Sequence, residues 1–157
     1  MRSLFRLLAI MALMSMALNS ASFAGNEKTT KSITKGHRVA IQVDQNDPAV
    51  MNLALNNATN IFEYYLKKGE PVEVNIVTYG PGLNMLREGS PVQARIKQLK
   101  DLAFPGKIQF SACNNTKQAM EKREGQAIAL LPEAHLVPAG VVTLMELQEK
   151  GWSYVRP

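Results

Sequence analysis

Cysteine is the scarcest informative residue in this chain: among 157 residues there is only Cys113. One cysteine excludes an internal disulfide framework, and the absence of a C-x-x-C pair argues against a dithiol oxidoreductase of the thioredoxin type. Histidine is nearly as scarce, since only His37 and His135 are present. A Cys/His metal site needs three or four ligands at close spacing, so we expect no metal site.

The chain also lacks a strong excess of one charge. Its 18 Lys and Arg against 13 Asp and Glu give a net charge of +5, and without Arg2 and Arg6, near the N-terminus, the net charge falls to +3. The longest basic clusters are pairs, and signs alternate along the chain. The sequence therefore carries no electrostatic footprint for nucleic acid, and a solvated surface of mixed sign is expected.

Glycine-rich phosphate signatures are missing as well. Gly82 is followed three residues later by Met85 rather than glycine, and no Lys-Ser or Lys-Thr pair comes after it. Both the dinucleotide fingerprint and the phosphate-binding loop are therefore excluded, and we expect no cofactor. The Gly80-Pro81-Gly82 segment is interpreted as a tight turn that lets loops approach one another, with an anion cradle as the alternative.

What is present begins with the pattern of a secretory signal. Arg2 and Arg6 precede an apolar run at 7–18, and residues 22–24 (Ser-Phe-Ala) place small side chains where a signal peptidase cleaves. The run is shorter than the roughly 20 residues that span a bilayer. We expect residues 1–24 to be a cleaved signal peptide of an exported, periplasmic protein without stable membrane insertion afterwards; the alternative is an uncleaved membrane anchor.

The remainder is predicted to be a polar, flexible leader at 25–36 followed by one α/β domain at 37–157. Branched and alternating apolar residues predict strands at 37–43, 72–79, 108–112, 136–138 and 152–155. Apolar residues at three- and four-residue steps and capping signals predict helices at 48–68, 83–87, 90–102, 117–123 and 140–150. This alternation predicts a three-layer α/β/α domain with a mostly parallel sheet of about five strands.

Ligands of open α/β sheets bind beyond the carboxyl ends of the strands. Two segments fit that rule, and their residues form the predicted pocket: Tyr79, Gly80, Gly82, Cys113, Asn114, Asn115 and Thr116. The two histidines are placed at the amino end of the sheet, because His37 opens a strand and His135 precedes one. A Cys–His nucleophilic pair is therefore not expected.

Cys113 is the candidate catalytic residue of this pocket. It stands where a strand passes into a helix, and the free N–H groups and partial positive charge of a helix N-terminus favour the thiolate, which is the nucleophilic form. The alternative is a buried, inert cysteine, because free cysteine is among the most buried residue types.

Four segments of the chain resemble DsrE/DsrF-like proteins. They are residues 79–83 (Tyr-Gly-Pro-Gly-Leu), 110–116 (Phe-Ser-Ala-Cys-Asn-Asn-Thr), 137–141 (Val-Pro-Ala-Gly-Val) and 147–157 at the C-terminus. The resemblance implies a compact α/β/α domain that assembles as a homotrimer or homohexamer. It also implies sulfur handling, in which Cys113 takes a sulfane sulfur, holds it as a persulfide and passes it on.

Three functions are consistent with this sequence. The first is a sulfur-carrier or sulfurtransferase-like protein that works through Cys113 with a donor or acceptor protein or a small thiol. The second is a non-enzymatic oligomeric binding module in which Cys113 only packs. The third is a thiol redox sensor, in which Cys113 passes through sulfenic or mixed-disulfide states.

Overall fold

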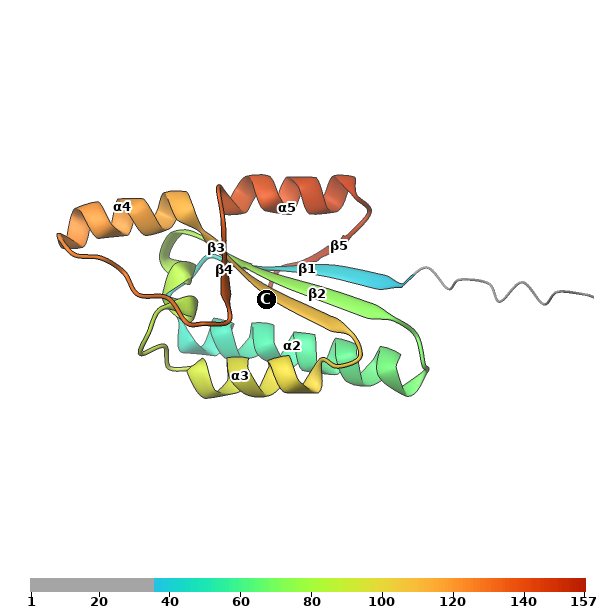
Figure 1. Cartoon of the computed structure of the whole chain (residues 1–157). Helices are drawn as coiled ribbons and strands as arrows, with labels where there is room; N and C mark the ends of the chain where they lie inside the picture. Colours follow the sequence, from blue (N-terminus) through green and yellow to red (C-terminus); the bar gives the residue numbers. More distant parts are fainter. Residues whose placement is uncertain (1–35) are drawn as a thin grey trace, which may run out of the picture. The chain divides into compact units, whose positions relative to one another are not determined.

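The computed structural model describes residues 36–157, so the expected signal peptide and the leader up to residue 35 lie outside the described part. The described residues build a single sheet of five parallel strands in the order β4-β3-β2-β1-β5 (Figure 1). The strands are β1 (His37–Val43), β2 (Val72–Thr78), β3 (Lys107–Cys113), β4 (Ala134–Val137) and β5 (Ser153–Val155).

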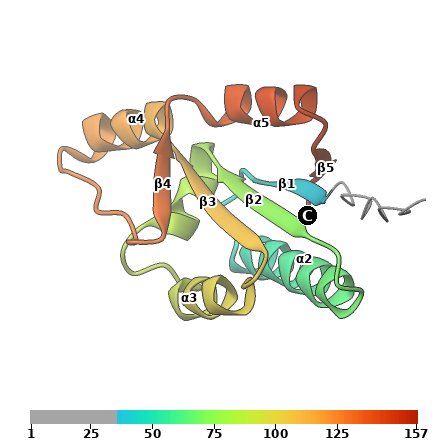
Figure 2. The same cartoon turned by 45° about the vertical axis from the view of Figure 1, so that its right-hand side comes forward.

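Helices flank both faces of this sheet. They are α2 (Pro48–Lys67), the 3₁₀ helix η1 (Gly80–Leu86), α3 (Gln93–Leu102), α4 (Asn114–Glu124) and α5 (Gly140–Glu149). Helices α2 and α3 lie on one side, whereas α4 and α5 lie on the other, which confirms the three-layer α/β/α prediction (Figures 1 and 2). None of the helices in this described part is both long and apolar enough to cross a membrane.

The longest helix shows how local sequence sets the element. The Asp47 carboxylate accepts a hydrogen bond from the Ala49 N–H at 2.8 Å, and Pro48 occupies the first helical position, where its missing N–H costs nothing. Met51, Leu55 and Phe62 lie on one stripe of α2 and are almost fully buried against the sheet. The cap and the apolar stripe thus fix where α2 begins and which face it buries.

The two faces of the sheet differ in chemistry. The face toward α2 and α3 carries the main apolar core, including Val39, Ile41, Val74, Ile76 and Phe110. The alternate residues point to the α5 side, where only Ala40, Val77 and Leu144 form a small buried apolar cluster. Polar residues, including Glu73, Asn75, Gln109 and Ser111, occupy the rest of that face. A parallel sheet covered on both faces is normally apolar on both, so this face is only partly covered by helix.

One expected placement is wrong. The fourth strand starts at Ala134 rather than Leu136, so His135 lies inside β4 and pairs in register with Ser111, while Val137 pairs with Cys113. Because β4 is short and pairs only with the carboxyl half of β3, the start of β4 is not at the amino end of the sheet. His135 is therefore two residues from the level of Cys113, and its side chain is exposed.

His37 does open β1 at the amino end of the sheet, as expected. Its ring stacks on Tyr65 with centroids 3.7 Å apart, and Nε2 lies 2.8 Å from a carboxylate oxygen of Glu70. These contacts fix the start of β1 to the end of α2.

Candidate functional site

Cys113 ends β3 and is the N-cap residue of α4. Its Sγ accepts a hydrogen bond from the backbone N–H of Thr116 at 3.5 Å, which satisfies one of the free donors of the helix start. The residue is only 5% exposed. The sequence therefore placed this cysteine correctly at a helix N-terminus, and the structure adds that it is buried there.

Opposing effects set the acidity of this thiol. Burial raises the pKa of Cys113, but hydrogen bonds from the Thr116 hydroxyl and from the backbone N–H groups of Gly140, Thr116 and Asn115 lower it, and the net pKa lies below that of an ordinary thiol. These donors favour the charged form of the sulfur directly. The site therefore holds a larger thiolate fraction than an unassisted cysteine would at the same pH.

Thr116 connects Cys113 to the turn after β2. The Thr116 hydroxyl oxygen accepts a hydrogen bond from the Gly80 N–H at 2.9 Å, which leaves its own hydrogen free to be donated to the Cys113 sulfur. Two segments that the sequence singled out separately, the turn at Gly80 and the cysteine loop, thus form one hydrogen-bonded unit.

Gly140, which the sequence analysis did not select, completes the surroundings of the thiol. A Cβ at this position would lie 2.9 Å from the Tyr79 Cβ and 3.3 Å from the Cys113 Cβ. Only glycine therefore lets the start of α5 approach both residues closely enough for its N–H to reach the sulfur. Burial, followed by the nearby Asp44 carboxylate, raises the pKa of Tyr79, so this phenol remains protonated beside the site.

The other predicted pocket residues have different positions. Asn114 and Asn115 open α4, and the Asn115 N–H also lies 3.3 Å from the Pro138 carbonyl oxygen, which holds the loop after β4 against the site. Gly82 is packed against β1 instead: a Cβ there would lie 2.2 Å from the Val43 carbonyl oxygen. Gly82 thus allows η1 to approach β1. The atoms nearest to its missing Cβ belong to Val43 and Asp44 and not to the cysteine loop.

A cavity of about 380 Å³ lies beside this unit, at the carboxyl ends of the strands. It shares Gly80 and Thr116 with the surroundings of Cys113, and the residues that line it are Asn46, Gly80, Pro81, Asn84, Thr116, Ala119, Met120 and Arg123. Asn46 and Gly140 follow β1 and β4, so applying the strand-end rule to every strand would have found both. Arg123 gave no such signal, because its place depends on the length and direction of α4.

No group of three His, Cys, Asp or Glu side chains within residues 36–157 lies closely enough to hold a metal ion.

Comparison with known proteins adds two solved structures. No family model matches the chain, and no curated protein matches it. The chain is similar to the Methanobacterium thermoautotrophicum protein MTH1491, described as a protein of unknown function, with 30% identity and a TM-score of 0.65 over 77% of this chain and 99% of that one.

A second similar structure is BT1422 from Bacteroides thetaiotaomicron, described as a conserved protein of unknown function. It has 15% identity and a TM-score of 0.50 over 76% of this chain and 93% of that one, and at this identity the likeness concerns the fold alone. The identity to MTH1491 over nearly its whole length goes further than fold. The chain therefore belongs to the same family as MTH1491 of Methanobacterium thermoautotrophicum.

Proposed function

We propose that this protein is a sulfur carrier of the DsrE/DsrF-like type, which accepts and passes sulfane sulfur as a persulfide on Cys113. The observation that carries the proposal is the surroundings of the thiol: one hydroxyl and three backbone N–H groups favour its thiolate, and the chain contains no second cysteine. A lone, activated thiol suits sulfur transfer, because each step is the attack of one sulfur on another.

The proposed loading step conserves atoms and charge. The Cys113 thiolate attacks the outer sulfur of a donor persulfide, R–S–SH; a new S–S bond forms at Cys113, the S–S bond of the donor breaks, and R–S⁻ leaves. Discharge is the same exchange with an acceptor thiolate attacking the outer sulfur on Cys113. The Thr116 hydroxyl and the Gly140 N–H stabilise the attacking thiolate and, after discharge, the returning one.

A persulfide on Cys113 would also make the transferred sulfur accessible to an acceptor thiol, although Cys113 itself is buried. The outer sulfur would extend about 2 Å beyond the Sγ of Cys113, the length of one S–S bond. Loading therefore moves the reactive atom outward, while the unloaded thiol, only 5% exposed, remains shielded from bulky oxidants.

The cavity beside the site supports a small thiol as donor or acceptor. Its volume of about 380 Å³ lies in the range of small-molecule sites. Asn46 and Asn84 supply amide groups at this cavity, and Arg123 supplies a guanidinium that also lies 3.5 Å from a Glu124 carboxylate oxygen. This lining fits a polar thiol better than an apolar one.

Cold cyanolysis tests the proposed carrier. The reduced protein is incubated with a small persulfide donor, freed of it and treated with cyanide, and thiocyanate equal to one sulfur per chain is expected. Cys113→Ser should release none. A mixed disulfide with the donor thiol in place of releasable sulfur would favour a redox sensor, and a biological role that survives in Cys113→Ser would favour a binding module.

Assembly and export belong to the same proposal. Large apolar side chains are exposed on α5 and at the end of β4, namely Leu136, Val141, Val142 and Met145, each close to half exposed. Such a group is expected where copies of a chain meet, which supports a homotrimer or homohexamer. Export to the periplasm rests on residues 1–24 alone, outside the described part.

A further inference from the structure

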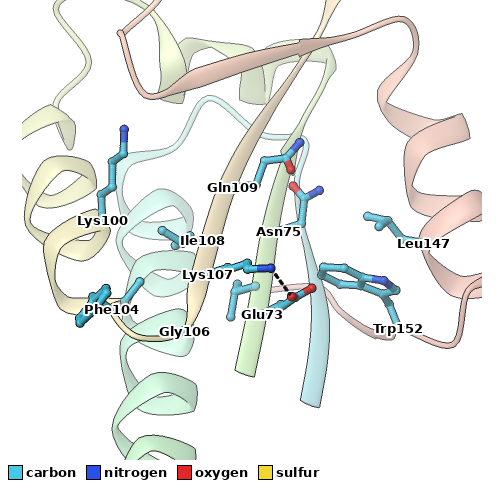
Figure 3. A pocket seen from close by; sticks show the side chains of 12 residues that line it. Glu73, Asn75, Lys100, Phe104, Gly106, Lys107, Ile108, Gln109, Leu147 and Trp152 are labelled. Atoms are coloured by element: carbon cyan, nitrogen blue, oxygen red, sulfur yellow. Dashed lines mark ion pairs between the residues drawn. The ribbon is translucent and has the colours of Figure 1, made fainter. Parts of the chain in front are cut away.

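A second cavity, of about 460 Å³, follows the free edge of β3 at the amino end of the sheet, away from Cys113; Lys100 and Phe104 line it on the α3 side, and Leu147 and Trp152 line it on the α5 side. It exists because β4 pairs with β3 only from Phe110 onward, so the amino half of β3 has no neighbouring strand on that side. Figure 3 shows the lining residues on both sides of β3, with Lys100 and Phe104 beside α3 and Leu147 and Trp152 beside α5. The other residues used below are Glu73, Asn75, Lys107 and Gln109.

Asn75 is the unusual residue of this cavity. It lies in the middle of β2, is only 4% exposed and still lines the cavity. Its Oδ1 accepts a hydrogen bond from the Ser111 hydroxyl at 2.8 Å, and within residues 36–157 nothing accepts from its Nδ2. None of the described side chains has a fully buried polar atom without a partner, so Nδ2 of Asn75 is open to the cavity, where solvent or a ligand can accept from it.

Gln109 complements Asn75 through the same hydroxyl. Gln109 Nε2 donates to the Ser111 oxygen at 3.1 Å, which leaves Oε1 of Gln109 as an acceptor. A serine hydroxyl donates only one hydrogen, so while it donates to one amide the other amide must donate to it. If the O and N positions of both amides were exchanged, Gln109 would present the donor and Asn75 the acceptor to the cavity, so the pair would still offer one of each.

The remaining walls restrict the shape and charge of a ligand. Trp152 and Leu147 stand across from Asn75 and Gln109 and form an apolar wall (Figure 3). On the polar side, Lys107 Nζ lies 3.2 Å from a Glu73 carboxylate oxygen, so these two charges compensate each other, and Lys100 adds one positive charge on the α3 side. An indole wall facing a donor–acceptor pair suits a flat ring with a polar edge.

We propose that this cavity is a binding site for a small, flat ring that carries an amide edge, with its N–H and C=O paired to Gln109 and Asn75 and its face against Trp152. The site is independent of Cys113 and goes beyond the proposed sulfur transfer.

Uracil is the probe, because it is flat and neutral and has adjacent N–H and C=O groups; 1,3-dimethyluracil is its matched control, since it keeps the ring and the carbonyls but has no N–H. Trp152 is the only tryptophan of the chain, so its fluorescence, excited outside the absorption of uracil, reports binding directly. The side-chain amide signals of Asn75 and Gln109 in NMR spectra report the polar contacts.

We expect uracil to change both signals saturably and 1,3-dimethyluracil to bind at least about tenfold more weakly, as follows from the loss of a hydrogen bond to the site. Gln109→Leu, at an exposed position that tolerates substitution, should weaken uracil binding by a similar factor, whereas Gln118→Leu on α4 should not.

Equal binding of the two probes, or unchanged uracil binding in Gln109→Leu, would overturn the proposal. So would a fall in the assembled mass of Trp152→Leu by light scattering, because this face would then be an interface between copies.

Discussion

The chemistry of Cys113 is decided by a few atoms. Burial alone would make this thiol a weaker acid, and the hydrogen bonds of Thr116, Gly140 and Asn115 reverse that effect. Thr116 is the key member, because it offers both its hydroxyl and its backbone N–H to the sulfur. Among the groups that lower the pKa of Cys113, the Thr116 hydroxyl is the one that belongs to a side chain and can be removed by substitution.

Thr116→Val, which keeps the shape but removes the hydroxyl, should raise the pKa of Cys113. The rate of alkylation by iodoacetamide follows the thiolate, so it rises with pH through the pKa of the folded protein. In the wild type the midpoint should lie below the ordinary thiol value of about 8.5. In Thr116→Val it should move upward, and Thr59→Val, which removes a hydroxyl bonded to Leu55 in α2, should leave it in place.

The close packing of Gly140 against Tyr79 and Cys113 can be tested by substitution. Gly140→Ala would push a methyl group against Tyr79 and Cys113, and overpacking of this kind costs about 1–3 kcal/mol in the free energy of unfolding. Because the N–H of residue 140 would move from the sulfur, thiol reactivity at neutral pH should fall as well. Gly82→Ala is the comparison: its clash with the Val43 backbone should destabilise by about 3 kcal/mol or more without a specific change in the pKa of Cys113.

Sequence reasoning reached Cys113 but not its partners, for a physical reason. The end of an alternating strand followed by Asn and Thr is a local pattern, and it places the cysteine at a helix start. The contacts of Gly140 and of the Gly80 N–H join segments far apart in the chain, and only the register of the sheet brings them together. Applying the strand-end rule to all strands would have recovered Gly140 as a candidate.

Among the elements, α4 has the weakest anchoring in the core. Met120 is its only buried residue, so the helix is held mainly at its ends. Cys113 caps the start of α4, and Gly125 ends the helix in the left-handed conformation with φ of 69°. Near this end, the Arg87 guanidinium donates two hydrogen bonds, of 3.0 and 2.8 Å, to the Glu124 carboxylate. The Arg87–Glu124 ion pair thus stabilises the C-terminal end of α4, whose N-terminal end carries Cys113.

Glu124→Gln should therefore lower stability at neutral pH but not in acid. Hydrogen bonds from Arg87 hold the pKa of Glu124 below its usual range. A carboxylate with a lowered folded-state pKa contributes stability above its unfolded pKa of about 4.3, and this contribution is lost as the pH falls through the folded value. In urea titrations the difference between wild type and Glu124→Gln should shrink from pH 7 to pH 3, and Glu149→Gln, an exposed change at the end of α5, should show no such trend.

The elements themselves were largely predictable, and the errors have local causes. The start of β4 was missed because Ala134 and His135 are not typical strand residues, and pairing with Phe110 and Ser111 overrides that preference. The start of α4 was placed late because Asn114, Asn115 and Thr116 favour caps over helix interiors, yet all three lie in its first turn.

At the scale of the whole domain, the sheet separates an apolar face from a polar one. Glu73 and Asn75 alternate with apolar residues in β2, as Gln109 and Ser111 do in β3, so this local pattern was available in the sequence although the sequence analysis did not use it. Its partial cover could not be predicted, because it follows from the short β4 and from α5 lying over β1 and β2. The site at the strand ends and the cavity at the amino end therefore lie at opposite ends of the sheet.

Assembly gives a prediction for the whole molecule. Met145→Lys places a charge in the middle of the exposed apolar group on α5, and it should reduce the mass measured by light scattering from that of an oligomer to that of one chain. Lys122→Met on the exposed side of α4 is the control for a change of charge and should leave the mass unaltered. A single-chain mass for the wild type would contradict the proposed homo-oligomer.

The most direct test of the central claim is intact-mass spectrometry of the reduced protein before and after a small persulfide donor, and again after an acceptor thiol. The account predicts the gain of one sulfur atom on the wild type, its loss to the acceptor, and no gain on Cys113→Ser. An unchanged wild-type mass, together with a Cys113 that resists alkylation in the folded protein, would contradict it.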